Sequence, residues 1–399
     1  MKTEFHRETA PRARTRAPRK PDVICLSHLR WDFVFQRPQH LLSRCAKQRR
    51  VFFVEEPVNG VDFPTLEVRE AQPGVHVAVP RLPEGLDEEQ TVSIQRRLLG
   101  EMVRRHAIDE YVLWYYAPMA LPFTRHLTPR AVVYDCMDEL SGFAGAHERL
   151  RDHEAELLRR SHLVLTGGHS LYEAKKARHH NIHPLPSSVD VEHFARARRP
   201  LPEPADQASI PHPRLGFFGV IDERMDLELV ADVAKARPGW QIVLVGPIVK
   251  IDPASVPRLP NIHCLGKKTY DELPAYLSGW DVALLPFARN EATRFISPTK
   301  TPEYLAACKP VVSTSIRDVV RPYGELGLVR IADTPGDFIA AVEACLAEER
   351  GATTEHGRAV RRARIDGFLA QVSWDGTWSR VEALLSETLR TRPRMLGGA

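Results

Sequence analysis

The chain has 399 residues, a formal net charge of +4, and 43% hydrophobic and 27% charged residues. This length is too great for one ordinary core and favours a globular protein with two domains. No apolar run is as long as a membrane span, and the N-terminus lacks the apolar segment of a signal peptide, so we expect a cytoplasmic protein.

The first twenty residues are basic. They hold seven basic and two acidic side chains, a local balance of +5, which leaves the rest of the chain near −1. A Pro-containing, aromatic-poor segment of this kind is predicted to be disordered over residues 1–20. The alternative is a tether to anionic lipid or nucleic acid; we expect peripheral contact with the inner face of the plasma membrane and no nucleic-acid partner.

Six scattered cysteines form no CxxC pair, and most lie in apolar strand or helix patterns. This distribution is typical of buried, reduced thiols. Three neighbouring histidines, His179, His180 and His183, lie in polar sequence without cysteine partners or an HExxH pattern. The sequence therefore predicts neither a disulfide framework nor a metal site.

From Asp22 onward, short β-rich runs alternate with amphipathic stretches, which predicts βαβ units around a parallel sheet. Residues 21–194 form the first domain in this interpretation. Its predicted strands are 23–26, 51–54, 76–79, 111–116, 131–135 and 163–166, and its predicted helices are 39–47, 88–106 and 146–160.

Residues 195–213 are rich in Pro, Arg and Ala and have the composition of an interdomain linker. The alternation then restarts and predicts a second domain over 214–370. Its predicted strands are 215–220, 242–245, 262–265, 282–285 and 311–313, and its predicted helices are 227–236 and 272–278. We therefore predict an α/β protein with two doubly wound, Rossmann-like domains that face each other across a cleft.

The last segment, 371–399, is predicted to be a helix and tail. Trp374 and Trp378 lie four residues apart, and an apolar stripe continues from them along one helical face. Such a stripe should pack onto a domain.

In the second domain, Lys300 and Glu303 lie in the first turn of a predicted helix between two strands. A helix N-terminus attracts anions, a lysine strengthens the attraction, and a glutamate one turn on can accept hydrogen bonds from hydroxyls. Phosphate and sugar would suit this pair. The alternative is a surface lysine with a glutamate that pairs with the helix dipole.

Strand ends in the second domain add candidate residues. Gly219 and Gly246 follow predicted strands, where glycine lets a ligand approach the backbone, and Arg224 could hold a diphosphate by two parallel hydrogen bonds. A plain turn explains Gly246 equally well.

In the first domain, the loop after the first predicted strand crowds His28, Trp31 and Arg37 together. Loops with so many reactive and stacking side chains usually line a site, and we assign these three residues to the acceptor side. After a later strand come Asp135 and Asp138, either of which could act as a general base for a hydroxyl acceptor. The alternative is that Asp138 caps a helix.

The sequence also resembles a known family. The strongest motif is Ser297-Pro298-Thr299-Lys300, followed by Glu303-Tyr304-Leu305-Ala306-Ala307 and Lys309-Pro310-Val311-Val312. Residues 261–281 and 189–194 support it. On these residues the chain resembles, over 21–390, a GT-B glycosyltransferase of the group 1, family 4-like kind that builds bacterial polysaccharides.

The resemblance implies that the second domain binds a nucleotide diphosphate sugar, the first presents the acceptor, and the last helix crosses back to the first domain. It implies that Lys300 contacts the donor diphosphate and Glu303 the ribose hydroxyls or nearby sugar. The nucleotide sugar is a co-substrate, and no cofactor is implied. The donor-binding candidates are Gly219, Arg224, Gly246, Pro298, Thr299, Lys300 and Glu303.

The chain departs from the family pattern at three positions near these candidates. Phe295 stands where many members have a glutamate eight residues before Glu303. Val220 and Met225 lie in the region after Gly219 where paired basic residues are expected, and only Arg224 is basic there. Diphosphate binding should therefore depend on Lys300 and Arg224.

The predicted function is metal-independent transfer of a sugar from a nucleotide diphosphate sugar to a hydroxyl of a lipid-linked or growing cell-surface glycan. A nucleotide-sugar epimerase would use the same two-domain plan, but it would change the donor without an acceptor. A catalytically inactive sugar-nucleotide scaffold would bind the donor without turnover.

Overall fold

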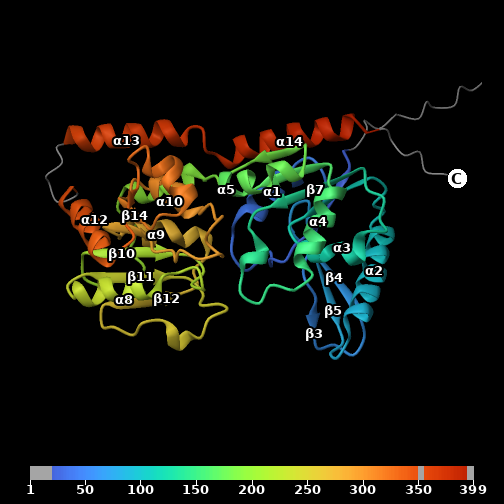
Figure 1. Ribbon diagram of the computed structural model, residues 1–399, viewed down its shortest axis with the longest axis horizontal. Coiled ribbons are helices and arrows are strands. Elements are labelled where there is room, and N and C mark those ends of the chain that lie inside the picture. The colour runs from blue at the N-terminus through green and yellow to red at the C-terminus, as the bar shows by residue number, and fades with distance from the viewer. Residues whose placement is uncertain (1–19, 349–354, 393–399) are drawn as a thin grey trace, which may run out of the picture.

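The computed structural model describes residues 20–348 and 355–392. The predicted tail, residues 1–20, lies outside these ranges except for Lys20, whose ammonium pairs with Glu382 at 2.7 Å. The chain forms two separate sheets, each covered by helices (Figure 1). Within the described ranges, no helix combines the length and the apolar character needed to cross a membrane.

The first sheet contains nine strands in the order β3-β5-β2-β1-β6-β7-β8-β9, with β4 paired to β5. All pairs are parallel except β4 with β5. Its strands are β1 (Asp22–Leu26), β2 (Val51–Val54), β3 (Val58–Asn59), β4 (Thr65–Gln72), β5 (Val75–Leu82), β6 (Tyr111–Tyr115), β7 (Ala131–Cys136), β8 (Leu163–Thr166) and β9 (Ile182–Pro184). Its helices are α1 (Arg37–Ala46), α2 (Glu88–Arg105), α3 (Leu121–Thr124), α4 (Leu150–Arg160) and α5 (His169–Lys175).

Alternate residues of a strand point to opposite faces of the sheet, and β1 is buried on both. Val23 and Cys25 join one hydrophobic cluster, whereas Ile24 and Leu26 join another. The central strand is therefore covered by helices on both sides, as expected for a parallel sheet.

The second sheet has six parallel strands in the order β12-β11-β10-β13-β14-β15. Its strands are β10 (Arg214–Phe218), β11 (Gln241–Val245), β12 (Ile262–Gly266), β13 (Val282–Leu285), β14 (Val311–Ser313) and β15 (Arg330–Ile331). The helices between β9 and α13 are α6 (Val191–Ala195), α7 (Ala205–Ala208), α8 (Leu227–Ala236), α9 (Leu273–Ser278), α10 (Lys300–Ala306), α11 (Arg317–Val319) and α12 (Pro335–Ala347). The predicted linker 195–213 includes α7 and packs against the second domain, where Ala197 and Ile210 join the hydrophobic cluster and Gln207 is buried.

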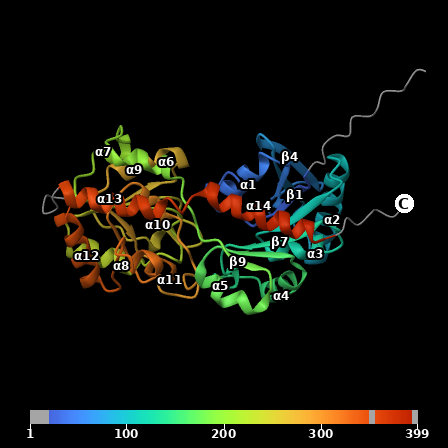
Figure 2. The same ribbon diagram turned by 90° about the horizontal axis from the view of Figure 1, so that it is seen from above.

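Two C-terminal helices run along the same side of both halves (Figures 1 and 2). Helix α13 (Glu355–Leu369) contacts α10 in the second half. Helix α14 (Trp374–Arg390) then buries Trp374, Trp378, Val381 and Leu385 in the cluster beneath β1. This confirms the predicted GT-B arrangement, including the last helix that crosses back to the first domain.

Contacts between the halves fix their relative orientation. The backbone N–H of Ser170, in the first turn of α5, donates to Asp318 Oδ1 of α11 at 3.0 Å. The Ser187 hydroxyl donates to the Ser297 carbonyl at 2.9 Å. Both contacts lie close to the loop that precedes Lys300, so the two halves meet beside the candidate site.

Candidate functional site

Two cavities with shared walls lie between the domains, beyond the carboxyl ends of the second sheet's strands. The wider one, of about 390 Å³, lies between the loop 31–36 of the first domain and the ends of β10 and β11. The narrower one, of about 90 Å³, reaches Asp138 and Ser187. Both cavities are lined by Gln36, Val220, Arg224, Thr299 and Lys300. The carboxyl edge of such a sheet is where ligands bind in open α/β folds.

Two glycines in the wall of the wider cavity allow close packing of their neighbours. Gly219, at φ +137°, leaves room for Lys300, because a Cβ there would lie 2.6 Å from the lysine Nζ. Gly246, at φ +150°, faces Gly219, and a Cβ there would overlap the Gly219 carbonyl. Any L side chain would be strained at these φ values, so the backbone conformation favours glycine at both predicted positions.

Lys300 lies at the junction of the two cavities. Its ammonium sits 5.5 Å from the centre of the Phe217 ring, and it forms no ion pair within 4.0 Å with any residue that the structure describes. Burial and the neighbouring Arg224 lower the pKa of Lys300 from its ordinary value, against the carboxylates of Glu303, Asp222 and Asp138. A bound anion would supply the countercharge that this lysine lacks.

Glu303 is buried one turn further along α10 and lines the wider cavity. Burial raises its pKa, and Lys300 opposes that effect. Tyr270 lies in the same wall, and its buried hydroxyl has no hydrogen-bond partner among the described residues. These polar groups could accept and donate hydrogen bonds to the hydroxyls of a ligand.

Arg224 lines both cavities but is already paired. Its Nε lies 3.0 Å from Asp222 Oδ1 and its Nη2 lies 2.7 Å from Asp222 Oδ2. Its guanidinium also stands 5.5 Å from the centre of the Phe143 ring of the first domain. The predicted two-point contact with a diphosphate would therefore use Nη1 or displace Asp222.

Pro298 and Thr299 lie where the motif predicts, in the loop that leads into α10. Pro298 lines the narrower cavity, and Thr299 lines both. Thr299 occupies the N-cap position without a side-chain hydrogen bond. Helix α10 has only seven residues, so the positive charge of Lys300 dominates this end of the cleft.

On the first-domain wall, Asp138 is half-buried and lines the narrower cavity with Lys300 and Arg224. Burial raises its pKa, and the cations of Arg224, Arg37 and Lys300 act against that effect. The short helix that follows has Glu139 as its N-cap residue. The alternative, in which Asp138 caps that helix, is therefore wrong.

Asp135 is fully buried beside Arg37, which is 2% exposed. Arg37 Nη2 donates to Asp135 Oδ1 at 2.8 Å, and Nη1 donates to the Leu185 carbonyl at 2.7 Å. Arg37 reaches the edge of the narrower cavity, but its charge is neutralised. The geometry thus gives Asp135 a structural role, without the open carboxylate that a general base needs.

The other two acceptor-side candidates differ in position. Trp31 lines the wider cavity, packs against Phe53 and accepts a hydrogen bond from Gln39 through its carbonyl. His28 lines neither cavity. Burial lowers its pKa to about 4, so the imidazole is neutral at physiological pH.

The structure adds residues that the sequence did not single out. Asp222 holds Arg224, and Gln36 lines both cavities. Lys267 lines the wider cavity, and its ammonium donates to the Asp32 carbonyl across the cleft at 3.2 Å. The sequence could have indicated the role of Asp222, because it lies two residues before Arg224. Nothing in the local sequence around Gln36 or Lys267 indicates that they line the cleft.

The three residues that depart from the family pattern lie in different environments. Val220 lines both cavities, where a basic residue was expected. Met225 is buried in the core of the second domain. Phe295 is half-buried and packs against a hydrophobic cluster of the first domain.

Comparisons with known proteins agree with this geometry. Residues 212–348 match the family model of group 1 glycosyl transferases. The chain is 27% identical over 289 residues to the putative teichuronic acid biosynthesis glycosyltransferase TuaH of Bacillus subtilis. The aligned region covers 65% of this chain and 70% of TuaH.

Solved structures share the fold at low identity. Sucrose-phosphate synthase from Thermosynechococcus elongatus has a TM-score of 0.69 and 13% identity, and the match covers 93% of this chain and all of that one. The E. coli structure named for trehalose-6-phosphate, bound with UDP-2-fluoro glucose, has a TM-score of 0.65 and 12% identity, covering 94% and 100%. The second domain thus matches the group 1 glycosyl transferases, and the chain is a glycosyltransferase with the GT-B fold.

Proposed function

We propose that the chain transfers a sugar from a nucleotide diphosphate sugar to a hydroxyl of a lipid-linked or growing cell-surface glycan. The observation that carries this proposal is Lys300, a lysine without an ion-pair partner in the described cleft, for whose side chain Gly219 leaves room. The similarity to a protein named for teichuronic acid biosynthesis supports a cell-surface glycan as the product.

In this mechanism the donor diphosphate lies against Lys300 and the free edge of the Arg224 guanidinium. Negative charge grows on the diphosphate as the sugar leaves, and fixed cations stabilise that charge most in a cleft shielded from water. Pro298 and Thr299 shape the same wall. Glu303 lies where it can accept hydrogen bonds from donor hydroxyls.

Asp138 faces this site from the first domain. During transfer, the bond between the sugar C1 and the diphosphate oxygen breaks, and a bond from C1 to the acceptor oxygen forms. Asp138 would take the proton of the acceptor hydroxyl, and its raised pKa suits a group that must hold that proton. Trp31 and Gln36 line the acceptor-side wall.

We also propose that no metal is required, because Lys300 and Arg224 would supply the charge that a metal ion provides elsewhere. Transfer that continues unchanged in excess EDTA supports this assignment, and a loss of transfer that Mg²⁺ restores would contradict it.

We place the protein in the cytoplasm at the inner face of the membrane, in contact through the basic tail. Equal binding of full-length and tail-deleted chains to anionic vesicles would contradict that contact.

The reaction is tested with the full chain, a panel of UDP- and GDP-sugars, and lipid extract from cell envelopes. We expect one donor to yield a glycosylated lipid-soluble product that depends on the extract. Conversion of the donor sugar without extract would indicate an epimerase instead. Donor binding without product would indicate a scaffold.

The donor site is tested by titration calorimetry of UDP and GDP with wild type and Lys300→Ala. A charged hydrogen bond contributes about 1.5–3 kcal/mol, so we expect the affinity for the preferred nucleotide to fall about 10- to 150-fold. The affinity for the corresponding nucleoside should change little. Lys235→Ala, on the exposed face of α8, is the matched control. Unchanged affinity for both nucleotides would refute the role of Lys300.

A further inference from the structure

A third cavity, with strong positive charge, lies at the opposite edge of the second sheet. We define it as the arginine pocket; its volume is about 410 Å³. Its walls come from the residues just before β10, β13 and β14, namely His212, Asp281 and Pro310, and from α13. The donor cleft lies at the carboxyl ends of the same strands, so the two sites are on opposite edges of the sheet.

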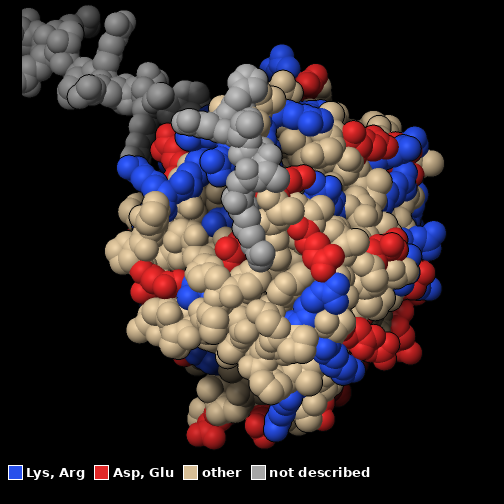
Figure 3. All heavy atoms as spheres, turned by 90° about the vertical axis from the view of Figure 1, so that its left-hand side faces the viewer, with Lys and Arg blue, Asp and Glu red and all other residues tan. Residues whose placement is uncertain are grey.

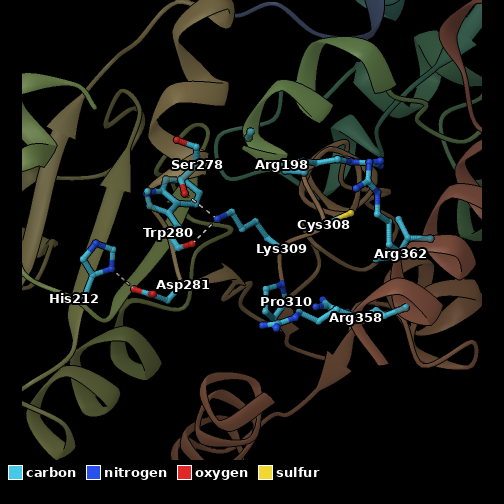
Figure 4. A pocket seen from close by; sticks show the side chains of 15 residues that line it. Arg198, His212, Ser278, Trp280, Asp281, Cys308, Lys309, Pro310, Arg358 and Arg362 are labelled. Carbon is cyan, nitrogen blue, oxygen red and sulfur yellow. Dashed lines mark hydrogen bonds and ion pairs between the residues drawn. The ribbon is translucent and has the colours of Figure 1, made fainter. Parts of the chain in front are cut away.

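Cations dominate this pocket. Its walls include Arg198, Lys309, Arg358, Arg361 and Arg362, and Figure 4 shows the side chains of Arg198, Arg358 and Arg362 on one side of Lys309, with His212 and Asp281 on the other. Figure 3 shows Lys and Arg side chains near the upper edge of this end of the molecule, interspersed with acidic ones.

Two described carboxylates offset part of this charge. Asp281 accepts a hydrogen bond from the backbone N–H of Arg214 at 2.6 Å and faces His212 Nδ1 at 2.7 Å. Asp366 lies 3.2 Å from Arg198 Nη1 and 3.8 Å from Arg362 Nε. The five cations that line the pocket outnumber these two carboxylates.

The cations differ in how far they are engaged. Lys309 Nζ donates to the carbonyls of Ser278 and Trp280 at 2.9 and 2.7 Å, and Arg198 Nε donates to the Ala306 carbonyl at 2.6 Å. These bonds fix the floor of the pocket. Arg358 makes no hydrogen bond or ion pair with another described residue, and the Arg362 side chain is 60% exposed. The rim therefore has guanidinium groups available for a ligand.

We propose that the arginine pocket binds a phosphate-bearing anion with at least two negative charges. Guanidinium groups bind phosphate through paired, charge-assisted hydrogen bonds, and the volume fits a group larger than a single inorganic ion. A soluble polyphosphorylated molecule and a lipid headgroup present the same chemistry, and the experiment separates them. The site is independent of the donor cleft and does not require the proposed transfer reaction.

Cys308 gives a local probe of this pocket. It is half-buried in the wall, and Arg198, Arg361 and Arg362 are close enough to influence its thiol. A bound phosphate group should shield this thiol from alkylation. Cys264, which is exposed on β12, provides an internal control in the same molecule.

The test uses the full chain with UDP saturating the donor cleft and sodium tripolyphosphate as the soluble probe. We expect calorimetry to show binding that falls at least tenfold in Arg358→Ser/Arg362→Ser. The control Arg104→Ser/Arg105→Ser removes the same charge from the exposed face of α2 and should bind as wild type does. Melting temperatures check that each variant is folded.

Alkylation and vesicles complete the test. Tripolyphosphate should slow the alkylation of Cys308 but not of Cys264 in the wild-type chain. Vesicles of phosphatidylcholine with phosphatidic acid, whose phosphomonoester can carry two negative charges, should retain less of the α13 variant than of the control if the ligand is a lipid headgroup, while the basic tail contributes equally to both. Equal tripolyphosphate binding by both double variants, or no protection of Cys308 by tripolyphosphate, would overturn the proposal.

Discussion

The two walls of the cleft carry ionic side chains that are paired in different ways. On the first-domain wall, Arg37 and Asp135 are buried, bond to each other and are neutral as a pair. On the second-domain wall, burial shifts the pKa of Lys300 down and that of Glu303 up, toward their uncharged forms. An ion pair whose partners bond to each other stabilises the shape of a site. Ionisable groups whose pKa values are shifted toward the uncharged form can instead interact with a ligand.

The same comparison separates the two candidate bases. Asp138 is half-buried and faces the cavity, whereas Asp135 faces Arg37. Replacing Asp138 with Asn should lower kcat/KM for transfer about 10²- to 10⁴-fold, the usual contribution of a general base. UDP affinity should stay within about threefold, because the cations that hold the diphosphate remain.

Steady-state kinetics with the acceptor identified in the donor screen measure this effect. Asp152→Asn, at an exposed position of α4, is the matched control and should retain full activity. A transfer rate for Asp138→Asn equal to that of the control would move the base elsewhere.

Breaking the satisfied pair should affect stability. Arg37→Met leaves the Asp135 carboxylate buried without its partner, so we expect a loss of about 3–5 kcal/mol in the free energy of unfolding. The double variant Arg37→Met/Asp135→Leu should recover most of that loss, because apolar residues often replace a buried ion pair without cost.

Urea unfolding followed by tryptophan fluorescence measures these differences. The exposed pair of Arg125 with Glu156, at 2.9 Å, supplies the control, since Arg125→Met should cost at most about 1 kcal/mol. A single variant at Arg37 that is no less stable than this control would show that the first wall does not depend on the pair.

Phe295 departs from the family pattern and lies where the two domains pack together. Its ring packs against the first domain, with the Arg294 guanidinium 5.2 Å from the ring centre. Phe295→Glu should lower stability by about 1–3 kcal/mol, because it removes apolar contacts and partly buries a carboxylate. Phe295→Leu, which keeps an apolar side chain, should cost less than about 1.5 kcal/mol.

Thermal unfolding and the transfer assay together measure the Phe295 variants. If Phe295→Glu stays as stable as Phe295→Leu and transfers sugar faster than wild type, position 295 still serves the donor, and its assignment to packing between the domains fails.

The fold could be predicted further from sequence than the site. Strand and helix alternation is local, so the longer parallel strands of both sheets and the stripe from Trp374 in α14 were predicted correctly, whereas the short parallel strands β3, β9 and β15 were missed. Strand β4 was missed, because it alternates half-buried residues with exposed charged ones at the edge of a sheet and lacks a continuous apolar run.

Lys300 and the glycines could be proposed from sequence because a motif and strand ends mark them. The partner of Asp135 could not, since Arg37 lies 98 residues away and only the assembled sheet brings the two together. The same limit applies to Asp318, which reaches Ser170 from the other domain. Pairing across long sequence separations decided which of the two predicted carboxylates faces the cavity.

The last expected effect is a pH dependence of donor binding that arises from the second-domain wall. Burial lowers the pKa of Lys300, so in the free protein this lysine loses its proton at a lower pH than an ordinary lysine does. A bound diphosphate favours the charged form and raises that pKa. UDP affinity should therefore be greatest below the lowered pKa of Lys300 and fall as pH rises through it, by at most about tenfold per pH unit.

Glu303 adds to the same trend, because its raised pKa means that it gains negative charge near the diphosphate as pH rises. Calorimetry between pH 7 and pH 10, above the ionisation of the UDP phosphates, measures the combined slope. Lys300→Arg should bind UDP with a weaker pH dependence, since a guanidinium stays charged throughout this range. The remaining slope in that variant then reports Glu303, and a wild-type affinity that stays constant to pH 10 would mean that Lys300 does not face the diphosphate.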